Sequence, residues 1–322
     1  MRCSEPSGCG NWPGRAGPKL RELWAVSACV GSIKALLIAA TVTAVLCGSP
    51  ALSATTHPHA AAALGRPSAP RISYYLALGD SVPVWNGNSS YPNLIVAHYQ
   101  RQLPGLRLDD MAMSGATTGT MRLGGQYLAA RSFLRAHSGH IALITIDIGG
   151  NDIVGCVGPG GIDPACSAQA RSTIKRNLTA MLAGLHAAAR GVRVIGMTYY
   201  NPFLGDWLAG GPSRSLALST LPGLVSLNRE LTALYGGAKT TADVQGMFRS
   251  TDLTTVVASQ WGDVPIAVKR ACSWLDIQCH VGAPEGFGDD PNNAGAAAIA
   301  SAFERTIGPL CTHKRSAGVS RC

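Results

Sequence analysis

The chain has 322 residues, of which 46% are hydrophobic and 14% are charged, so it can form one large folded domain or two small ones. This composition, without internal repeats or a long low-complexity linker, excludes a mainly disordered protein. The net charge is +9, but the basic residues are scattered and do not alternate with aromatic residues. This pattern argues against nucleic-acid binding and predicts only a weak attraction to an anionic cell envelope.

The N-terminal 54 residues have the pattern of a secretory signal. Basic residues precede the apolar stretch 35–46, and small residues follow it. We therefore predict an export signal over residues 1–54, with an uncleaved membrane anchor as the alternative. Either reading predicts a protein that is secreted or associated with the cell envelope. Residues 55–70 are rich in Ala, Pro, His and Thr, and we expect a disordered tether there, before a folded domain over residues 71–310.

The first element of this domain is the apolar run Tyr74–Leu78. It has no charged residue and no alternation of apolar and polar residues, which is typical of a strand buried on both faces of a parallel sheet. The run ends in Gly79-Asp80-Ser81. In open α/β sheets, ligand sites lie just beyond the carboxyl ends of the strands, so Ser81 is a candidate catalytic residue. The alternative is that Asp80 or Ser81 only caps a following helix.

Patterns typical of helices and strands alternate along the rest of the chain. Further strands are predicted at 106–113, 140–149, 192–202 and 240–245, and helices at 90–103, 126–136, 174–190, 216–235 and from 292 or 293 to 307. Repeated βα units predict a parallel sheet in a three-layer α/β/α sandwich. Within 216–235, Pro222-Gly223 is expected to separate the helix from an irregular lead-in. Residues 201–219 are expected either to line a substrate pocket or to form a surface loop.

Unusual polar residues follow two more of the predicted strands. The second strand leads into Ser114-Gly115-Ala116, and the third ends in Gly149-Gly150-Asn151-Asp152. Each group has a simple explanation as a turn, but the carboxyl ends of parallel strands share one edge, so the groups can converge. Together they suit a nucleophile at Ser81 whose oxyanion hole is formed by the N–H groups of Ser81 and Gly115 and by the amide of Asn151. Glycine at position 115 lets the backbone approach a substrate closely.

In this order and spacing, the three groups resemble the sequence blocks of the SGNH hydrolases, also called GDSL-type esterases and lipases. Gly79–Val82 matches the first block, with valine in place of the family's leucine, Gly115 matches the second and Gly149–Asp152 the third. The resemblance covers 74–307 and is greatest to secreted actinobacterial members. No G-x-S-x-G elbow of the other common serine-esterase fold occurs.

This resemblance implies a flavodoxin-like, five-stranded parallel sheet and hydrolysis of carboxylic esters without a metal or another cofactor. The substrate would be a small-molecule or lipid ester. Asp80 and Asp152 are then expected to support the site. We expect the protein to be a monomer.

The fourth family block is altered in this chain. In the family it contains an Asp-x-x-His pair, followed by Pro-Asn-x-x-Gly. Pro291, Asn292 and Gly295 match that ending, but Asp290 stands in place of the histidine and Phe287 in place of the acid. A carboxylate with a pKa near 4 is a weaker base than imidazole. The resemblance therefore predicts either a weakened esterase or a non-catalytic protein that binds an acyl or glycan ligand.

His280 is the candidate for a relocated base, because it lies on the segment that approaches Asp290. The alternative is an ordinary loop histidine. The other histidines lie in the tether, in the C-terminal tail, on predicted helices or at the opposite edge of the predicted sheet.

Six cysteines follow the export signal, and they form three local pairs. This even number in an exported protein predicts the disulfides Cys156–Cys166, Cys272–Cys279 and Cys311–Cys322, the last in a tail over 311–322. The alternative is a metal site, but only Cys279-His280 has a suitable spacing, and we predict no metal.

Overall fold

The computed structural model describes residues 72–310, except 159, 278 and 283–288. The chain divides into two units, Met1–Leu64 and Gly65–Cys322, and all described residues lie in the second. The predictions for the export signal, the tether, Phe287 and the Cys311–Cys322 disulfide fall outside the described residues. Within the described ranges, no helix combines the length and the apolar character needed to cross a bilayer.

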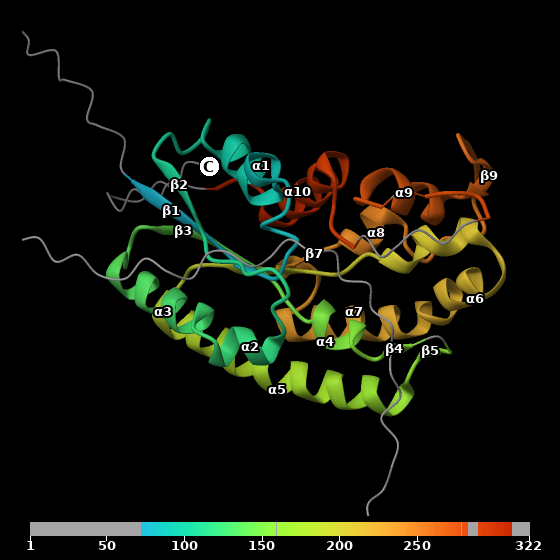
Figure 1. Cartoon of the computed structure of the whole chain (residues 1–322). Helices are drawn as coiled ribbons and strands as arrows, with labels where there is room; N and C mark the ends of the chain where they lie inside the picture. Colours follow the sequence, from blue (N-terminus) through green and yellow to red (C-terminus); the bar gives the residue numbers. More distant parts are fainter. Residues whose placement is uncertain (1–71, 159, 278, 283–288, 311–322) are drawn as a thin grey trace, which may run out of the picture. The chain divides into compact units, whose positions relative to one another are not determined.

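A five-stranded parallel sheet forms the centre of the domain, with the strand order β2-β1-β3-β6-β7 (Figure 1). Its strands are β1 (Ser73–Gly79), β2 (Leu106–Asp110), β3 (Ile141–Asp147), β6 (Val194–Met197) and β7 (Thr241–Ala242). The last five residues of both β1 and β3 are buried. The predicted parallel sheet with strands buried on both faces is therefore confirmed.

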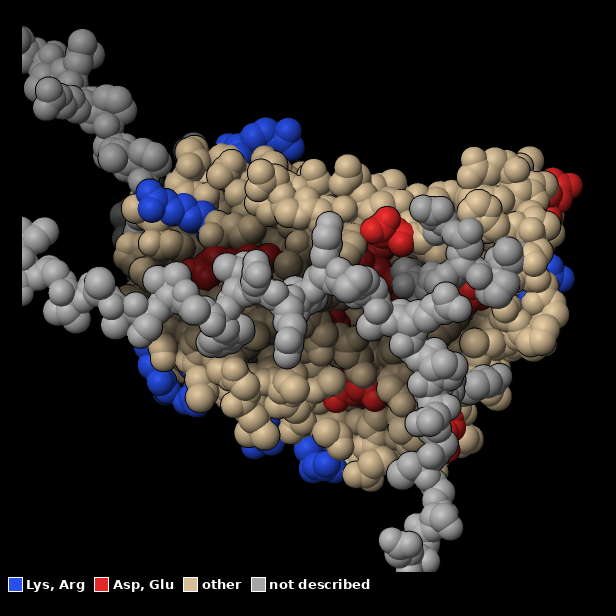
Figure 2. Space-filling view, in the orientation of Figure 1, with Lys and Arg blue, Asp and Glu red and all other residues tan. Residues whose placement is uncertain are grey.

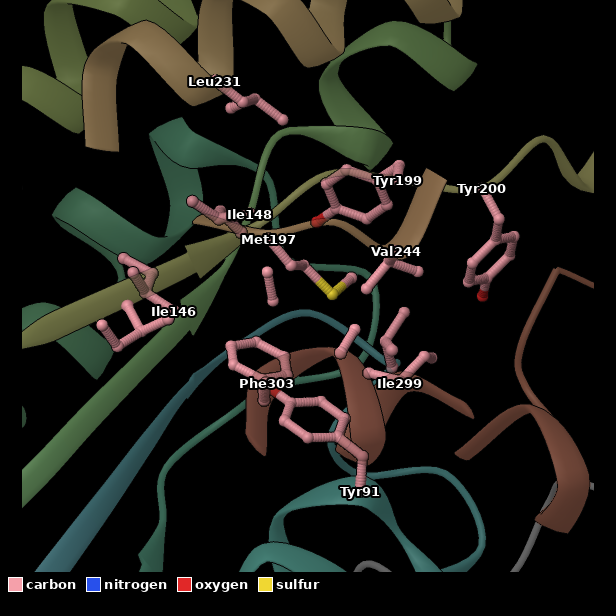
Figure 3. Packing of buried hydrophobic residues seen from close by; sticks show 14 of the residues in the cluster. Tyr91, Ile146, Ile148, Met197, Tyr199, Tyr200, Leu231, Val244, Ile299 and Phe303 are labelled. Carbon is pink, nitrogen blue, oxygen red and sulfur yellow. The ribbon is translucent and has the colours of Figure 1, made fainter. Parts of the chain in front are cut away.

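Helices cover both faces of the sheet, which gives the predicted three-layer sandwich (Figure 1). One face carries α1 (Tyr91–Tyr99), α8 (Val244–Phe248), α9 (Ile266–Trp274) and α10 (Asn293–Ile307). The other carries α2 (Thr118–Leu123), α3 (Gln126–Ala136), α4 (Gly150–Val154), α5 (Pro164–Ala188) and α7 (Leu221–Tyr235). Figure 3 shows the resulting core, with Leu231 and Phe303 on opposite sides of the strands. The ring of Phe303 stacks on that of Tyr91, with centroids 4.9 Å apart.

Some elements differ from the sequence-based expectation. The helix predicted at 216–235 is two helices, α6 (Gly211–Ser219) and α7, and Thr220 lies between them. Pro222 lies in the first turn of α7, where its missing N–H has no helical partner to lose, so this helix begins close to Pro222-Gly223, as expected. The lead-in that was expected to be irregular is instead the helix α6. The segment before α6 forms a 3-10 helix, η2 (Pro202–Ala209), and two further 3-10 helices are η1 (Gly87–Ser89) and η3 (Ala238–Thr240).

Two short hairpins were not predicted. They are β4 (Val157–Gly158) with β5 (Gly161–Ile162), and β8 (Val256–Ser259) with β9 (Gly262–Pro265). The Cys156–Cys166 disulfide closes the first hairpin, and Cys272–Cys279 joins α9 to the segment that follows it. The Cα atoms of both pairs are 5.6 Å apart, within the range usual for disulfides.

Gly196 on β6 provides a test of how closely α7 packs on the sheet. A Cβ atom added at this position would lie 2.2 Å from the ring of Tyr235. We expect Gly196→Ala to lower the free energy of unfolding by about 1–3 kcal/mol, measured by urea denaturation. Gly119→Ala on α2 is the matched control, because its Cβ would have no neighbour closer than 3.6 Å, and it should not destabilise the fold. Equal effects of the two substitutions would contradict this packing.

Candidate active site

The turn after β1 carries Asp80 and Ser81. Asp80 is only 2% exposed, and its carboxylate accepts hydrogen bonds from the Val82 N–H at 3.1 Å and from the Tyr199 hydroxyl at 2.7 Å. The carbonyl of Ser81 accepts the N–H of Trp85 at 2.9 Å. Neither Asp80 nor Ser81 is the N-cap of a described helix. Asp80 therefore stabilises the turn that presents Ser81, and the helix-cap alternative does not apply.

The loops after β2 and β3 are tied to each other at the same edge of the sheet. The Asn151 side-chain amide donates a hydrogen bond to the carbonyl of Ala116 at 3.0 Å. The Asp152 carboxylate accepts the N–H of Thr118 at 2.8 Å and its hydroxyl at 2.6 Å. Gly115 has a φ of 75°, a conformation that favours glycine. These contacts hold Gly115 next to Asn151.

A third segment brings Asp290 to Ser81. The carbonyl of Asp290 accepts the N–H of Asp276 at 2.8 Å, and the next carbonyl, of Pro291, accepts the side-chain amide of Asn86. Since Asn86 belongs to the loop that follows Ser81, this bond joins the two loops. The Ser81 hydroxyl is close enough to the Asp290 carboxyl to stabilise its charged form, which lowers the pKa of Asp290.

Gly295, which follows Asp290 at the start of α10, is held against the end of α9. A Cβ atom added there would lie 2.1 Å from the Trp274 carbonyl oxygen. The N-cap residue Asn292 accepts the N–H of Gly295 at 3.2 Å and donates through its own N–H to the Trp274 carbonyl at 2.9 Å. This close contact explains why the chain has glycine at this position.

Ser81 and Asp290 line one cavity of about 80 Å³, which also contains Asn151. Its remaining walls are mostly apolar and come from α4, the β4–β5 hairpin, η2 and α7; they include Ile153, Val157, Ile162, Phe203, Leu224 and Leu227. Part of the segment after β6 lines the cavity, as one of the two sequence-based alternatives expected. Figure 2 shows acidic side chains in the hollowed centre of this face, with Lys and Arg at its edge.

The buried carboxyl groups near this cavity have unusual proton affinities. Burial raises the pKa of Asp80 to about 7, although the hydrogen bonds from Tyr199 and Val82 partly oppose the shift. Burial also raises the pKa of Asp290, which the Ser81 hydroxyl lowers in part and the nearby carboxylates of Asp289 and Asp276 raise further.

Asp147, at the end of β3, is a fully buried acid that the sequence analysis did not single out. Its Oδ1 accepts the Tyr91 hydroxyl at 2.9 Å, and its Oδ2 has no hydrogen-bond partner among the described residues. A Cβ atom added at Gly79 would lie 2.2 Å from Oδ1, so this carboxyl lies against the end of β1. Burial, and then the charge of Asp80, raises the pKa of Asp147 well above its ordinary value. The signal available in the sequence was a charged residue inside an otherwise apolar strand.

His280, the candidate for a relocated base, lies away from Ser81. It is exposed and does not line the cavity that contains Ser81. Tyr199 and Tyr200, which follow β6 at the same edge of the sheet as Ser81, do line it, although the sequence analysis did not name them.

The buried position of Asp147 predicts how stability depends on pH. Because its pKa is raised in the folded state, the folded protein holds a proton that the unfolded chain loses above about pH 4. The contribution of Asp147 to stability is therefore greatest at low pH and falls as the pH rises towards its raised pKa, by about 1.4 kcal/mol per pH unit.

We expect Asp147→Asn, which keeps an acceptor for the Tyr91 hydroxyl, to reduce the loss of unfolding free energy between pH 5 and pH 8. Urea denaturation at both values measures this loss. The exposed Asp263→Asn should leave it unchanged. An Asp147→Asn profile identical to that of the natural protein would show that Asp147 does not titrate in this way.

Residues 77–221 match the model of the GDSL-like Lipase/Acylhydrolase family, a range that includes Ser81, Gly115 and Asn151 but ends before Asp290. None of the curated proteins that were compared matches the chain.

Similar solved structures include an extracellular lipase from Streptomyces rimosus, which is 22% identical, with 73% of this chain and 99% of that chain covered and a TM-score of 0.45. Phospholipase A1 from Streptomyces albidoflavus is 20% identical, with 73% and 99% covered and a TM-score of 0.45. An acetyl xylan esterase from Geobacillus stearothermophilus is 18% identical, with 74% and 97% covered and a TM-score of 0.46. By this match, residues 77–221 are a region similar to the GDSL-like lipase/acylhydrolase family.

Proposed function

We propose that this protein is an exported ester hydrolase in which Ser81 is the nucleophile and the Asp290 carboxylate accepts its proton. One observation carries the proposal: Ser81 and Asp290 line the same largely apolar cavity, with the Ser81 hydroxyl near enough to lower the pKa of the Asp290 carboxyl. The two disulfides support an oxidising environment outside the cytoplasm.

The reaction would proceed in two steps. Ser81 Oγ attacks the ester carbonyl carbon while its proton passes to Asp290. The tetrahedral intermediate then loses the alcohol, which takes the proton from Asp290 and leaves an acyl group on Ser81. In the second step a water molecule attacks this acyl-serine, gives a proton to Asp290 and releases the carboxylic acid, and the proton returns to Ser81.

Hydrogen-bond donors are available for the negative charge that develops on the carbonyl oxygen. The Asn151 amide uses one N–H for Ala116, which leaves its second N–H for a substrate. The backbone N–H groups of Ser81 and Gly115 donate no hydrogen bond within the part of the chain that the structure describes. These are the donors that the family resemblance implies.

The environment of Asp290 makes it a stronger base than an ordinary carboxylate. Burial raises its pKa, and a base is most effective when its pKa is near the working pH. Asp290 nevertheless carries no positive charge after it takes the proton, so it lacks the stabilising effect of an imidazolium on the oxyanion. We therefore expect slow turnover.

A non-catalytic binding protein is the second candidate. It is favoured by the carboxyl groups of Asp80, Asp289 and Asp290 around Ser81, which would repel an oxyanion. In that case the cavity would hold an acyl or glycan ligand without turnover.

Covalent labelling distinguishes the two candidates. We expect a fluorophosphonate probe to modify Ser81, as found by peptide mass spectrometry, and Ser81→Ala to abolish the label. Asp290→Asn should slow labelling at least about tenfold, because a positioned general base usually contributes about a hundredfold or more. If no residue is labelled, the binding protein is the better account, and modification of another serine would refute the assignment of Ser81.

Restoring an imidazole at position 290 tests the geometry in the opposite direction. We expect Asp290→His to raise p-nitrophenyl ester hydrolysis at least about tenfold, because imidazole is the better base near neutral pH. The carboxylates of Asp276 and Asp289, which affect the charge of Asp290, are available to stabilise the imidazolium.

His280→Ala provides the control for a relocated base. It should leave hydrolysis unchanged if Asp290 is the base. If His280→Ala removes the activity and Asp290→His has no effect, the exposed His280 is the base and the assignment of Asp290 is wrong.

A further inference from the structure

The ionisable side chains that line the cavity beside Ser81 are all acidic among the described residues. Asp80, Asp289 and Asp290 line it, and none of the described residues in its wall is Lys, Arg or His. An anionic ligand, such as a free carboxylate or a phosphate, would be repelled from such a site.

One carboxylate oxygen of Asp290 is available for a ligand. It is only 9% exposed, and its Oδ1 is buried without a hydrogen-bond partner among the described residues. None of the ion pairs in the described part of the chain includes it. A buried carboxylate oxygen without a partner is unfavourable, so a ligand that brings a positive charge next to Oδ1 would be stabilised by it.

The other wall residues indicate which kind of cation fits. Tyr199, Tyr200 and Phe203 line the cavity, and aromatic rings attract alkylammonium groups. The ring of Tyr200 is held in place by stacking on Phe248, with centroids 4.5 Å apart. A metal ion fits less well, because no group of three or more His, Cys, Asp or Glu residues in the described ranges is arranged to hold one. The apolar walls suit the methyl groups of a quaternary ammonium.

From these observations we infer that the cavity recognises a quaternary ammonium group, and that the preferred substrates are esters carrying this group. The statement about substrates rests on the proposed hydrolase function. The statement about binding does not depend on it, since an ammonium group would bind whether or not Ser81 reacts.

A pair of esters with the same shape tests the inference. Butyrylcholine and 3,3-dimethylbutyl butyrate differ only in the exchange of a positively charged nitrogen for carbon. We expect kcat/KM of the natural protein at pH 8 to be at least about tenfold higher for butyrylcholine, the effect of a nearby opposite charge that is partly screened. Asp289→Asn removes one cavity carboxylate and should lower this ratio at least about threefold. Asp263→Asn, which removes an exposed carboxylate outside the cavity, should leave it unchanged.

Binding of choline and of 3,3-dimethylbutanol, measured by calorimetry, separates failure of this inference from failure of the proposed function. If neither ester is hydrolysed, the proposed function fails, and tighter binding of choline still supports the ammonium site. Equal kcat/KM values for the two esters, or choline that binds no more tightly than the neutral alcohol, would overturn the inference.

Discussion

Carboxyl groups that are buried without a cation at the carboxyl end of the sheet determine the chemistry of this protein. Asp80, Asp147 and Asp290 are all at most 9% exposed, and none belongs to an ion pair in the described part of the chain. Their side chains interact with hydroxyl and backbone N–H groups. Since burial penalises the charged form, these groups hold protons at a higher pH than exposed carboxyls do. Asp80, whose pKa is raised to about 7, can therefore exchange protons near neutral pH, where an ordinary aspartate cannot.

Connections between loops hold this arrangement in place. Asn86 and Pro291 join the segments that carry Ser81 and Asp290, and Asn151 and Asp152 join the loops after β2 and β3. The site is thus built from loops that follow different strands but share one edge of the sheet, as parallel α/β folds require. The Cys156–Cys166 disulfide closes the hairpin that contributes Val157 and Ile162 to the cavity wall.

Much of the fold was predictable from the sequence because its strands are apolar runs and its helices have regular apolar spacing. The helix predicted at 126–136 is α3 with the same bounds. The β4–β5 hairpin was missed because strands of two residues have no periodicity. Helix α9 was missed because its buried face consists of Ala267, Val268, Ala271 and Cys272, whose mostly small side chains give a weak pattern.

The candidate site was predictable only as far as its local sequence blocks. Ser81, Gly115, Asn151 and Asp290 could be named because each follows a strand or precedes a helix within a recognisable motif. The contacts of Asp80 with Tyr199 and of Asp147 with Tyr91 join residues 119 and 56 positions apart, and no local pattern predicts such pairs.

The central claim is that the Asp290 carboxylate takes the proton from Ser81. The most direct test is the pH dependence of the acylation rate, measured by stopped-flow release of p-nitrophenol from an activated ester. This account predicts an acylation rate that rises about tenfold per pH unit below the pKa of Asp290 and then levels off. The acylation rate of Asp290→Asn should not show this rise. The same pH-dependent rise in the acylation rates of the natural protein and of Asp290→Asn would contradict the claim that Asp290 is the base.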